Sequence, residues 1–260
     1  MKMEPSGDCP VCHGSGWELY ETSDGSEEVY GYTVMLTYAK KCSRCQGFTQ
    51  TDIDLTGVPD IYREVDIYRF NWDIYEMDMS MVRKVAFSLT NRYEEWRDEN
   101  RGLYLWSKTA GSGKTFLSCC IGKSIMLRTQ CRMRFISAPD YLNKVAESYN
   151  RDKGLTDPSQ IYRECDVLIL DDIGVQISKE WQMQELFRLI DTRVSKQLMT
   201  IYTSNYEPEK LNVDDRIKTR IAKTSMVIHM PEKSIRSIRA NEEQAKFYQK
   251  MFGGNEDGEN

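Results

Sequence analysis

The sequence has no apolar run long enough to cross a membrane and no apolar stretch near its start. A helix that spans a bilayer needs about 20 consecutive apolar residues, and the first ten residues, MKMEPSGDCP, place acids and a proline where a signal peptide is apolar. An excess of basic residues is also lacking, since the formal net charge is −5. These absences argue against a membrane protein, an exported protein and a uniformly basic nucleic-acid coat. They predict a cytoplasmic protein in which any contact with DNA comes from a local basic patch.

The length of the chain allows more than one structural unit. A chain of 260 residues accommodates one full-size domain and a small accessory module. We expect an accessory domain over residues 1–50, a linker and helix over 51–101, and the main domain over 102–250. The polar, acidic residues 251–260 are expected to form a disordered tail.

Short apolar runs alternate with segments of helical periodicity from Gly102 onward. This alternation predicts an α/β fold in which a parallel sheet is flanked by helices. Ahead of it, residues 51–78 are rich in aromatic residues and are expected to pack as an irregular segment. The apolar spacing that follows predicts one helix from Met79 to Asn100. The predicted strands are Leu103–Trp106, Met133–Ile136, Val167–Leu170, Leu198–Tyr202 and Met226–His229.

A glycine-rich run lies between the first predicted strand and the helix that follows it. Glycines there let backbone N–H groups close around phosphates at a helix N-terminus. Lys114 would supply positive charge to the β- and γ-phosphates, and the Thr115 hydroxyl would bind Mg²⁺. Lys108 stands where the pattern G-x-x-x-x-G-K-[ST] begins with glycine, which leaves the path of the loop open. The run predicts an ATP site formed by Ala110, Gly111, Ser112, Gly113, Lys114 and Thr115.

Two carboxylates end the third apolar run. Asp171 and Asp172 directly follow Val167–Leu170, and the carboxyl end of a central strand is where α/β sheets bind ligands. Asp171 would hold Mg²⁺, and Asp172 would polarise the water that attacks the γ-phosphate. The distance of this motif from the glycine-rich run favours an ATPase over a strand that merely ends in acids.

Polar residues farther along the chain are weaker candidates. Asn205 follows the fourth strand and could orient the attacking water, although a plain Ser-Asn turn has the same sequence. Arg216 and Arg220 lie four residues apart on one face of a predicted helix. Either they serve a neighbouring subunit's γ-phosphate, or they form a solvated face with an Asp-Arg pair. The spacing alone does not decide between these roles.

Together these motifs resemble the DnaC/DnaI helicase-loader family of AAA+ ATPases. The resemblance covers about residues 55–240, and it rests on LILDDIGVQ, on Thr203-Ser204-Asn205 with the arginine segment after it, and on Ser234-Ile235-Arg236. It implies a RecA-like AAA+ domain that lacks a C-terminal lid domain. It further implies that Asn205 is the sensor asparagine, that Arg216 or Arg220 is an arginine finger acting in trans in a self-associated assembly, and that Arg236 is a second sensor.

Four of the eight cysteines form two C-x-x-C pairs near the start of the chain. A hairpin is predicted between the pairs, with strands Trp17–Thr22 and Glu28–Ala39. This spacing suits tetrahedral coordination of Zn²⁺ and predicts a small zinc-ribbon-like domain. The remaining cysteines lie in predicted helices or strands and are expected to be core residues. The predicted zinc ligands are Cys9, Cys12, Cys42 and Cys45, and the predicted core cysteines are Cys119, Cys120, Cys131 and Cys165.

Charge distinguishes the two predicted domains. Residues 1–50 hold four Lys and Arg against seven Asp and Glu, whereas residues 208–240 hold eight against four. The acidic accessory domain therefore suits docking to protein, and the main domain is the better candidate for phosphate contacts. The loader family assembles on single-stranded DNA and binds a hexameric replicative helicase, so the resemblance implies these partners and a role in DNA replication. It also implies that the loop Tyr149–Gly154 faces the DNA.

Two other functions are compatible with the ATPase motifs. One is an IstB-type transposition helper that remodels duplex DNA, which the zinc module argues against. The other is a non-hydrolysing adaptor with a zinc-binding head, in which Lys108 marks a degraded ATP site. ATP turnover in the presence of DNA would exclude the adaptor.

Overall fold

The computed structural model describes four strands before residue 56 and most of the chain after it. The described residues are 17–22, 28–29, 32–33, 36–41, 56–63, 66–149, 157, 159–174 and 179–252. The four predicted zinc ligands, residues 150–154 of the predicted DNA-binding loop and residues 253–260 lie outside these ranges. The predictions made for them remain predictions.

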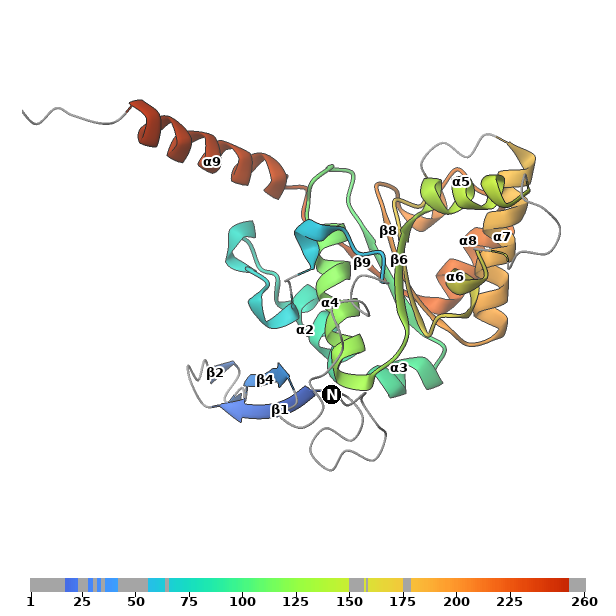
Figure 1. Ribbon diagram of the computed structural model, residues 1–260, viewed down its shortest axis with the longest axis horizontal. Coiled ribbons are helices and arrows are strands. Elements are labelled where there is room, and N and C mark those ends of the chain that lie inside the picture. Colours follow the sequence, from blue (N-terminus) through green and yellow to red (C-terminus); the bar gives the residue numbers. More distant parts are fainter. Residues whose placement is uncertain are drawn as a thin grey trace, which may run out of the picture.

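A five-stranded parallel sheet forms the centre of the molecule (Figure 1). The strand order is β6-β7-β8-β5-β9. The predicted α/β class and all five predicted strand positions are confirmed, and the order is that of a RecA-like AAA+ sheet. The strands are β5 (Gly102–Trp106), β6 (Met133–Ser137), β7 (Val167–Asp171), β8 (Met199–Ser204) and β9 (Ser225–His229).

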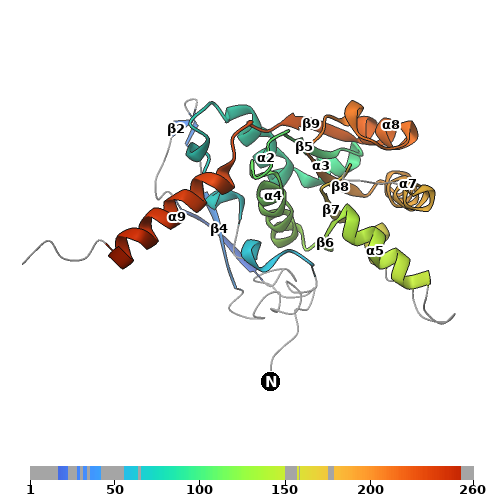
Figure 2. The ribbon, with the colours of Figure 1, turned by 90° about the horizontal axis from the view of Figure 1, so that it is seen from above.

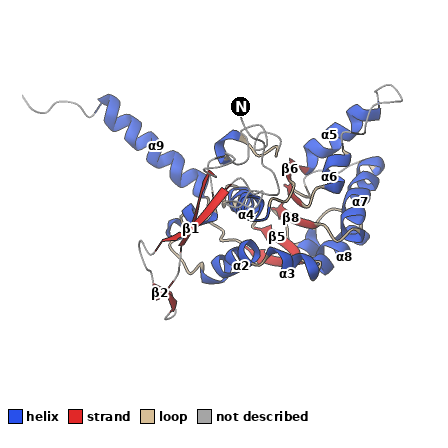
Figure 3. Ribbon diagram, turned by 60° about the horizontal axis from the view of Figure 1, so that its bottom comes forward, coloured by secondary structure: helices blue, strands red, loops and turns tan. Residues whose placement is uncertain are grey.

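Helices cover both faces of this sheet, as Figure 3 shows. Alternate strand residues point to opposite faces, so Leu103 and Leu105 enter one core and Tyr104 enters the other. All of β7 is buried because both of its faces are covered. The first core contains α4 (Lys114–Thr129), and the second contains α5 (Ala138–Tyr149), α6 (Gln160–Glu164), α7 (Glu180–Ser195) and α8 (Asp215–Thr224).

The aromatic-rich segment before the sheet packs against α4. Its side chains Ile67, Phe70 and Tyr75 are buried in the first core, as expected for an irregular segment that packs. It contains the 3₁₀ turns η1 (Asp60–Tyr62), η2 (Ile67–Arg69) and η3 (Asp73–Tyr75).

The single helix predicted over residues 79–100 is wrong. The structure has two helices, α2 (Ser80–Asn91) and α3 (Tyr93–Asp98), separated at Arg92 with φ −124° and ψ 38°. Thr90 and Asn91 have low helix propensity and directly precede the break. Tyr93 on α3 still reaches the first core, because its side chain is buried there.

Two further parts of the chain complete the fold. The last described helix, α9 (Ile235–Phe252), projects away from the rest of the molecule (Figure 2). Near the N-terminus, β1 (Trp17–Thr22) pairs antiparallel with β4 (Leu36–Lys41). The predicted continuous return strand is divided, since β2 (Glu28–Val29) and β3 (Tyr32–Thr33) form a short pair of their own. None of the helices that the structure describes is both long enough and apolar enough to span a bilayer.

Candidate nucleotide-binding site

The glycine-rich loop joins β5 to α4 at the carboxyl edge of the sheet. Gly111 has φ 77° and Gly113 has φ 90°, values in the left-handed region that glycine adopts without steric cost. Tyr75 approaches closely from outside, because a Cβ on Gly113 would lie 2.4 Å from its hydroxyl oxygen. That hydroxyl donates to the Ser112 carbonyl at 2.8 Å. Both glycines are therefore required by the shape of the loop.

Lys108 occupies the first position of the pattern without distorting the loop. Its φ is not positive, so no glycine is needed at this point of the backbone. Its side chain is exposed. The substitution therefore leaves the turn around Gly111 and Gly113 intact.

Lys114 is buried within the loop that it follows. Its ammonium group donates to the carbonyls of Ser107 and Thr109 at 3.2 and 3.1 Å and to the Ser112 hydroxyl at 3.2 Å. Burial lowers the pKa of Lys114, and the negative charges of Asp172 and Glu232 oppose that shift. The ammonium group is thus held where phosphate oxygens could replace the neutral acceptors that it now contacts.

Asp171 lies behind the loop and links three elements. One of its oxygens accepts from the Thr115 hydroxyl at 2.8 Å and from the Thr203 hydroxyl at 2.5 Å. Burial raises the pKa of Asp171 to about 6, although the Thr203 hydroxyl works in the opposite direction. The next residue, Asp172, has φ 53°, and its N–H donates to Thr203 Oγ1 at 3.0 Å. A buried carboxylate beside a threonine hydroxyl is a donor set that fits Mg²⁺.

A cavity of about 450 Å³ opens above the loop. Its walls include Asp172, Asn205 and Arg236, so these three predicted residues converge with Lys114 and Thr115. The backbone N–H of Arg236 also donates to the Gly111 carbonyl at 3.2 Å. The structure thus brings residues from the ends of β7 and β8 and from the start of α9 to one site.

Part of the cavity wall was not identified from the sequence. Tyr62 and Phe70 line one side together with Phe116 of α4, and their rings pack against Phe116 at centroid distances of 5.6 and 5.4 Å. Arg239 lines the wall as well, with its guanidinium 5.5 Å from the centre of the Phe116 ring. The only sequence signals were the aromatic content of residues 51–78 and the spacing of three residues between Arg236 and Arg239.

The predicted arginine pair, Arg216 and Arg220, lies elsewhere in the fold. Arg216 bonds Asp214 at 2.9 Å and Arg220 bonds Asp191 at 2.6 Å. Both guanidinium groups lie 4.5 Å from the centre of the Phe187 ring. Neither arginine is among the described residues that line the cavity. A role in a neighbouring subunit's site therefore stays a prediction.

Three of the four cysteines outside the C-x-x-C pairs are core residues as predicted, although Cys131 and Cys165 lie just outside the helices and strands. Cys119, Cys120 and Cys165 are buried core residues, and Cys131 packs against the first core while partly exposed. Within the described residues no group of three or more His, Cys, Asp or Glu side chains is suited to bind a metal ion. The cysteines predicted to bind zinc lie outside that part of the chain.

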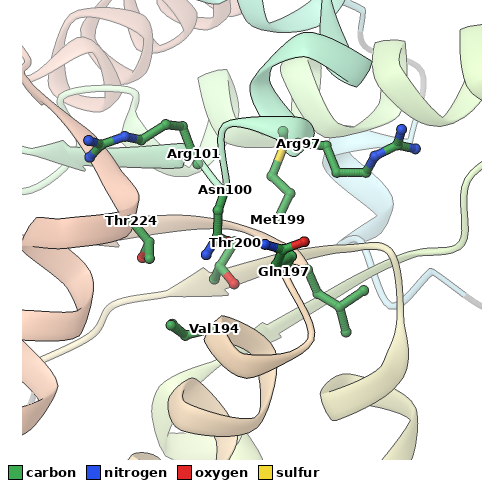
Figure 4. Close-up of a pocket in the computed structure, with 10 residues that line it drawn as sticks. Arg97, Asn100, Arg101, Val194, Gln197, Met199, Thr200 and Thr224 are labelled. Carbon is green, nitrogen blue, oxygen red and sulfur yellow. The ribbon is translucent and has the colours of Figure 1, made fainter.

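A second, smaller pocket lies at the opposite edge of the sheet (Figure 4). It is lined by the first residues of β5 and β8, including Gly102, Met199 and Thr200. The side chains of Arg97 and Arg101 point away from each other in this view. Its volume is only about 10 Å³, far below that of the cavity above the glycine-rich loop.

The model of the bacterial DnaA ATPase domain family matches residues 68–228. Several relatives are 30% identical to this chain over the aligned residues, among them a replication initiator and a helicase loader. The chromosomal replication initiator protein DnaA of Paraburkholderia xenovorans aligns over 141 residues, 53% of this chain and 26% of the relative. The replicative helicase loader DnaI of Bacillus subtilis aligns over 114 residues, 44% of this chain and 36% of the relative. The chain thus matches only about a quarter to a third of each relative's length.

Solved structures support the same fold. The DnaC helicase loader superposes with a TM-score of 0.58 at 18% identity, covering 66% of this chain and 100% of the loader chain. AMPPCP-bound DnaA from Aquifex aeolicus gives a TM-score of 0.53 at 21% identity, covering 74% and 57%. At these identities the likeness concerns the arrangement of helices and strands.

Proposed function

The chain belongs to the bacterial DnaA ATPase domain family of AAA+ proteins, and on that premise we propose that it is an ATP-dependent helicase loader. In this proposal it hydrolyses ATP, binds single-stranded DNA and recruits a hexameric replicative helicase during DNA replication. The observation that carries the nucleotide part is the convergence of the glycine-rich loop, Asp172, Asn205 and Arg236 on one cavity.

The phosphates of ATP would lie at the N-terminus of α4. The loop N–H groups and the helix dipole favour negative charge there, and Lys114 would exchange carbonyl acceptors for phosphate oxygens. Thr115 and Asp171 would hold Mg²⁺, which supplies positive charge to the β- and γ-phosphates when it is bound. Arg236 and Arg239 would add charge from the side of α9.

The base of the nucleotide would lie against the aromatic wall. Tyr62, Phe70 and Phe116 form a packed group beside the loop, and aromatic side chains stack favourably on a purine ring. This places the base on the segment before the sheet and the phosphates on the loop. The cavity of about 450 Å³ is within the range of ligand pockets in proteins.

Catalysis would depend on two polar residues within the cavity and one outside it. Asp172 would accept a proton from the attacking water, and Asn205 would orient that water. Arg216 or Arg220 would complete the site of an adjacent subunit, where its charge stabilises the transition state. Hydrolysis would therefore be slow until the chain self-associates.

The partners of this chain are proposed from its relatives and from charge. DnaI is named a replicative helicase loader, and a DnaA structure contains single-stranded DNA together with AMPPCP. We assign DNA binding to the main domain over residues 102–250. Helicase docking is assigned to the acidic domain over residues 1–50, closed by zinc on Cys9, Cys12, Cys42 and Cys45. Elemental analysis of the reduced protein should give one zinc per chain, lost in Cys9→Ser.

The experiment that tests the proposal measures ATP binding and turnover with single-stranded and duplex DNA, together with capture of a replicative helicase hexamer. We expect single strands to stimulate turnover and the helicase to be retained, and Lys114→Ala to abolish ATP binding. Preference for long duplex DNA without helicase capture would support a transposition helper or an initiator-like role. A chain that binds helicase but never hydrolyses ATP would be an adaptor.

A further inference from the structure

The segment after β9 runs along the outer side of the glycine-rich loop. Its first residue, Met230, donates its N–H to the Trp106 carbonyl at 2.7 Å. At the other end the N–H groups of Ile235 and Arg236 donate to the Gly111 carbonyl at 2.9 and 3.2 Å. We call residues 230–236 the loop strap. Both ends of the loop strap bond to the loop or to the end of β5, and its last two residues begin α9, which leaves the body in Figure 1.

Glu232 occupies the middle of the loop strap and bonds the first half of the loop. One carboxylate oxygen accepts the N–H of Lys108 at 3.0 Å. The other accepts the N–H of Thr109 at 2.7 Å, the Thr109 hydroxyl at 2.7 Å and the Ser107 hydroxyl at 3.0 Å. Three consecutive loop residues therefore converge on a single side chain.

His229 fixes the orientation of this carboxylate. Its ring stacks on Trp106, its partner in the sheet register, with centroids 4.0 Å apart and planes at 15°. Nε2 then lies 2.8 Å from the Glu232 oxygen that also accepts from Lys108. Burial would raise the pKa of Glu232, but hydrogen bonds from His229, from Thr109 and from the two loop N–H groups hold it well below its usual range.

Glu232 and Lys114 form hydrogen bonds with the same two loop residues, Ser107 and Thr109. The Lys114 ammonium group donates to the carbonyls of Ser107 and Thr109, and both residues are bonded to Glu232 through their other polar groups. Glu232 is not among the described residues that line the cavity, so it acts on the loop from outside. Its carboxylate therefore sets the loop position without competing for the phosphate site.

We propose that Glu232, oriented by His229, is a positioning residue that holds the entry half of the loop in the shape that binds nucleoside triphosphates. This inference rests on the proposed function of the cavity and deepens it. It also accounts for the tolerance of lysine at position 108, where the fixed part is the N–H group bonded to Glu232. Because the loop strap carries Arg236 into the cavity wall, the same contacts align the loop with that arginine.

The test compares Glu232→Ala, Glu232→Gln and the full unmodified chain by titration with a fluorescent ATP analogue and by steady-state turnover. We expect the Kd for the nucleotide to rise about tenfold in Glu232→Ala, a moderate effect because the Glu232 side chain is 37% exposed and water competes for its partners. Glu232→Gln retains one acceptor oxygen, so its Kd should lie between those of the unmodified chain and Glu232→Ala. The KM for ATP should rise, whereas kcat should stay within about threefold of its unmodified value, since Asp172 and Asn205 are untouched.

Two further variants keep the result interpretable. Glu242→Gln removes an exposed acid from α9 and should leave the Kd unchanged. If Glu232→Ala does not fold, Glu232→Gln and His229→Ala, which removes only the orienting partner, carry the test and should each raise the Kd about threefold. Nucleotide binding that is unchanged or tighter in folded Glu232 variants would overturn the inference, as would a fall in kcat at constant KM. Failure of the unmodified chain to bind ATP would instead refute the proposed function.

Discussion

Two arginine pairs on the last two helices differ in the charges around them. The outer pair, Arg216 and Arg220 on α8, is already bonded to Asp214 and Asp191. The inner pair, Arg236 and Arg239 on α9, lines the cavity, and neither of them is in an ion pair with another described residue. The inner pair thus offers a ligand of the same chain two guanidinium groups that no ion pair within the described part of the chain occupies, with Glu243 as the acid that shares the cavity wall. Each arginine of the outer pair must give up its ion pair with an aspartate before it can contact a phosphate.

This difference separates affinity from catalysis. A guanidinium group without an ion pair can contact the nucleotide as it binds and so contributes to affinity. A guanidinium group that leaves its aspartate only in an assembly contributes to hydrolysis instead. A ground-state contact and a transition-state contact are distinguished by their effects on Kd and kcat. The predictions below use that distinction.

The largest expected effect belongs to the outer pair. Arg220→Ala, or failing that Arg216→Ala, should lower DNA-stimulated ATP turnover about 10³-fold while the Kd for ATP stays unchanged. Mixing this variant with Lys114→Ala protein should restore part of the activity, because each subunit supplies what the other lacks. Arg188→Ala, which removes an exposed arginine from α7, is the control. Absence of rescue in mixed assemblies would make the outer pair structural.

Asp172→Asn should lower turnover on the order of 10²-fold while ATP still binds, since the acid acts on water in the chemical step. Unlike the arginine variant, it should not be rescued by Lys114→Ala protein. Both of these defects disable the chain's own site, so no site in the mixture is complete. Single-turnover kinetics with mixed proteins measures this, and normal turnover by Asp172→Asn would refute the role of Asp172.

The structure shifts the pKa of two acids in opposite directions: Asp171 near the glycine-rich loop is raised, and Asp214 beside the outer arginine pair is lowered. The folded pKa of Asp171, about 6 because of burial, lies above its unfolded value, so the native state binds more protons between about pH 4 and pH 6. Without Mg²⁺ and nucleotide, the free energy of unfolding should therefore fall by about 2 kcal/mol as pH rises through this window.

Urea unfolding at pH 4.5 and pH 7 checks the pH prediction. Asp171→Asn should remove this part of the pH dependence. Asp214→Asn should not alter it, because hydrogen bonds from Arg216 lower the pKa of Asp214 and move its titration below the window. Equal pH profiles for the unmodified protein and Asp171→Asn would contradict the expected burial effect.

The smallest effect is expected for the inner pair. Arg236→Ala should raise the Kd for ATP about tenfold, because it removes one charged contact to phosphate. Arg239→Ala should raise it less, since Arg239 also lies over the Phe116 ring. Isothermal titration with ATP and ADP measures both values. Unchanged affinity in Arg236→Ala would mean that its side chain does not contact the nucleotide.

The sequence was most informative where chemistry is local. Lys114, Thr115, Asp171 and Asp172 lie within short motifs directly after strands, and parallel strands bring their carboxyl ends to one edge. Periodicity alone located all five strands of the sheet. The convergence of these residues therefore followed from topology that the alternation of strands and helices already implied.

The cavity wall could not be derived in the same way. Tyr62 and Phe70 reach the site through packing of an irregular segment on α4, and no periodic pattern specifies where such a segment lies. No sequence motif identifies Glu232 either, because its role depends on the path of the loop strap. The break at Arg92 shows a third limit, since weak local propensities decided it within an otherwise regular apolar spacing.

The projection of α9 has a mechanical consequence. Its N-terminal half lines the nucleotide cavity with residues that include Ile235, Arg236 and Arg239, while Phe247 and Met251 near its far end are each 59% exposed. A straight helix of 18 residues is a rod about 27 Å long. Rotating such a rod by about 10° at its base moves its tip by about 5 Å. A shift of Arg236 by less than one bond length would thus become a much larger displacement at the apolar tip of α9. The loop strap is the point about which the helix would turn.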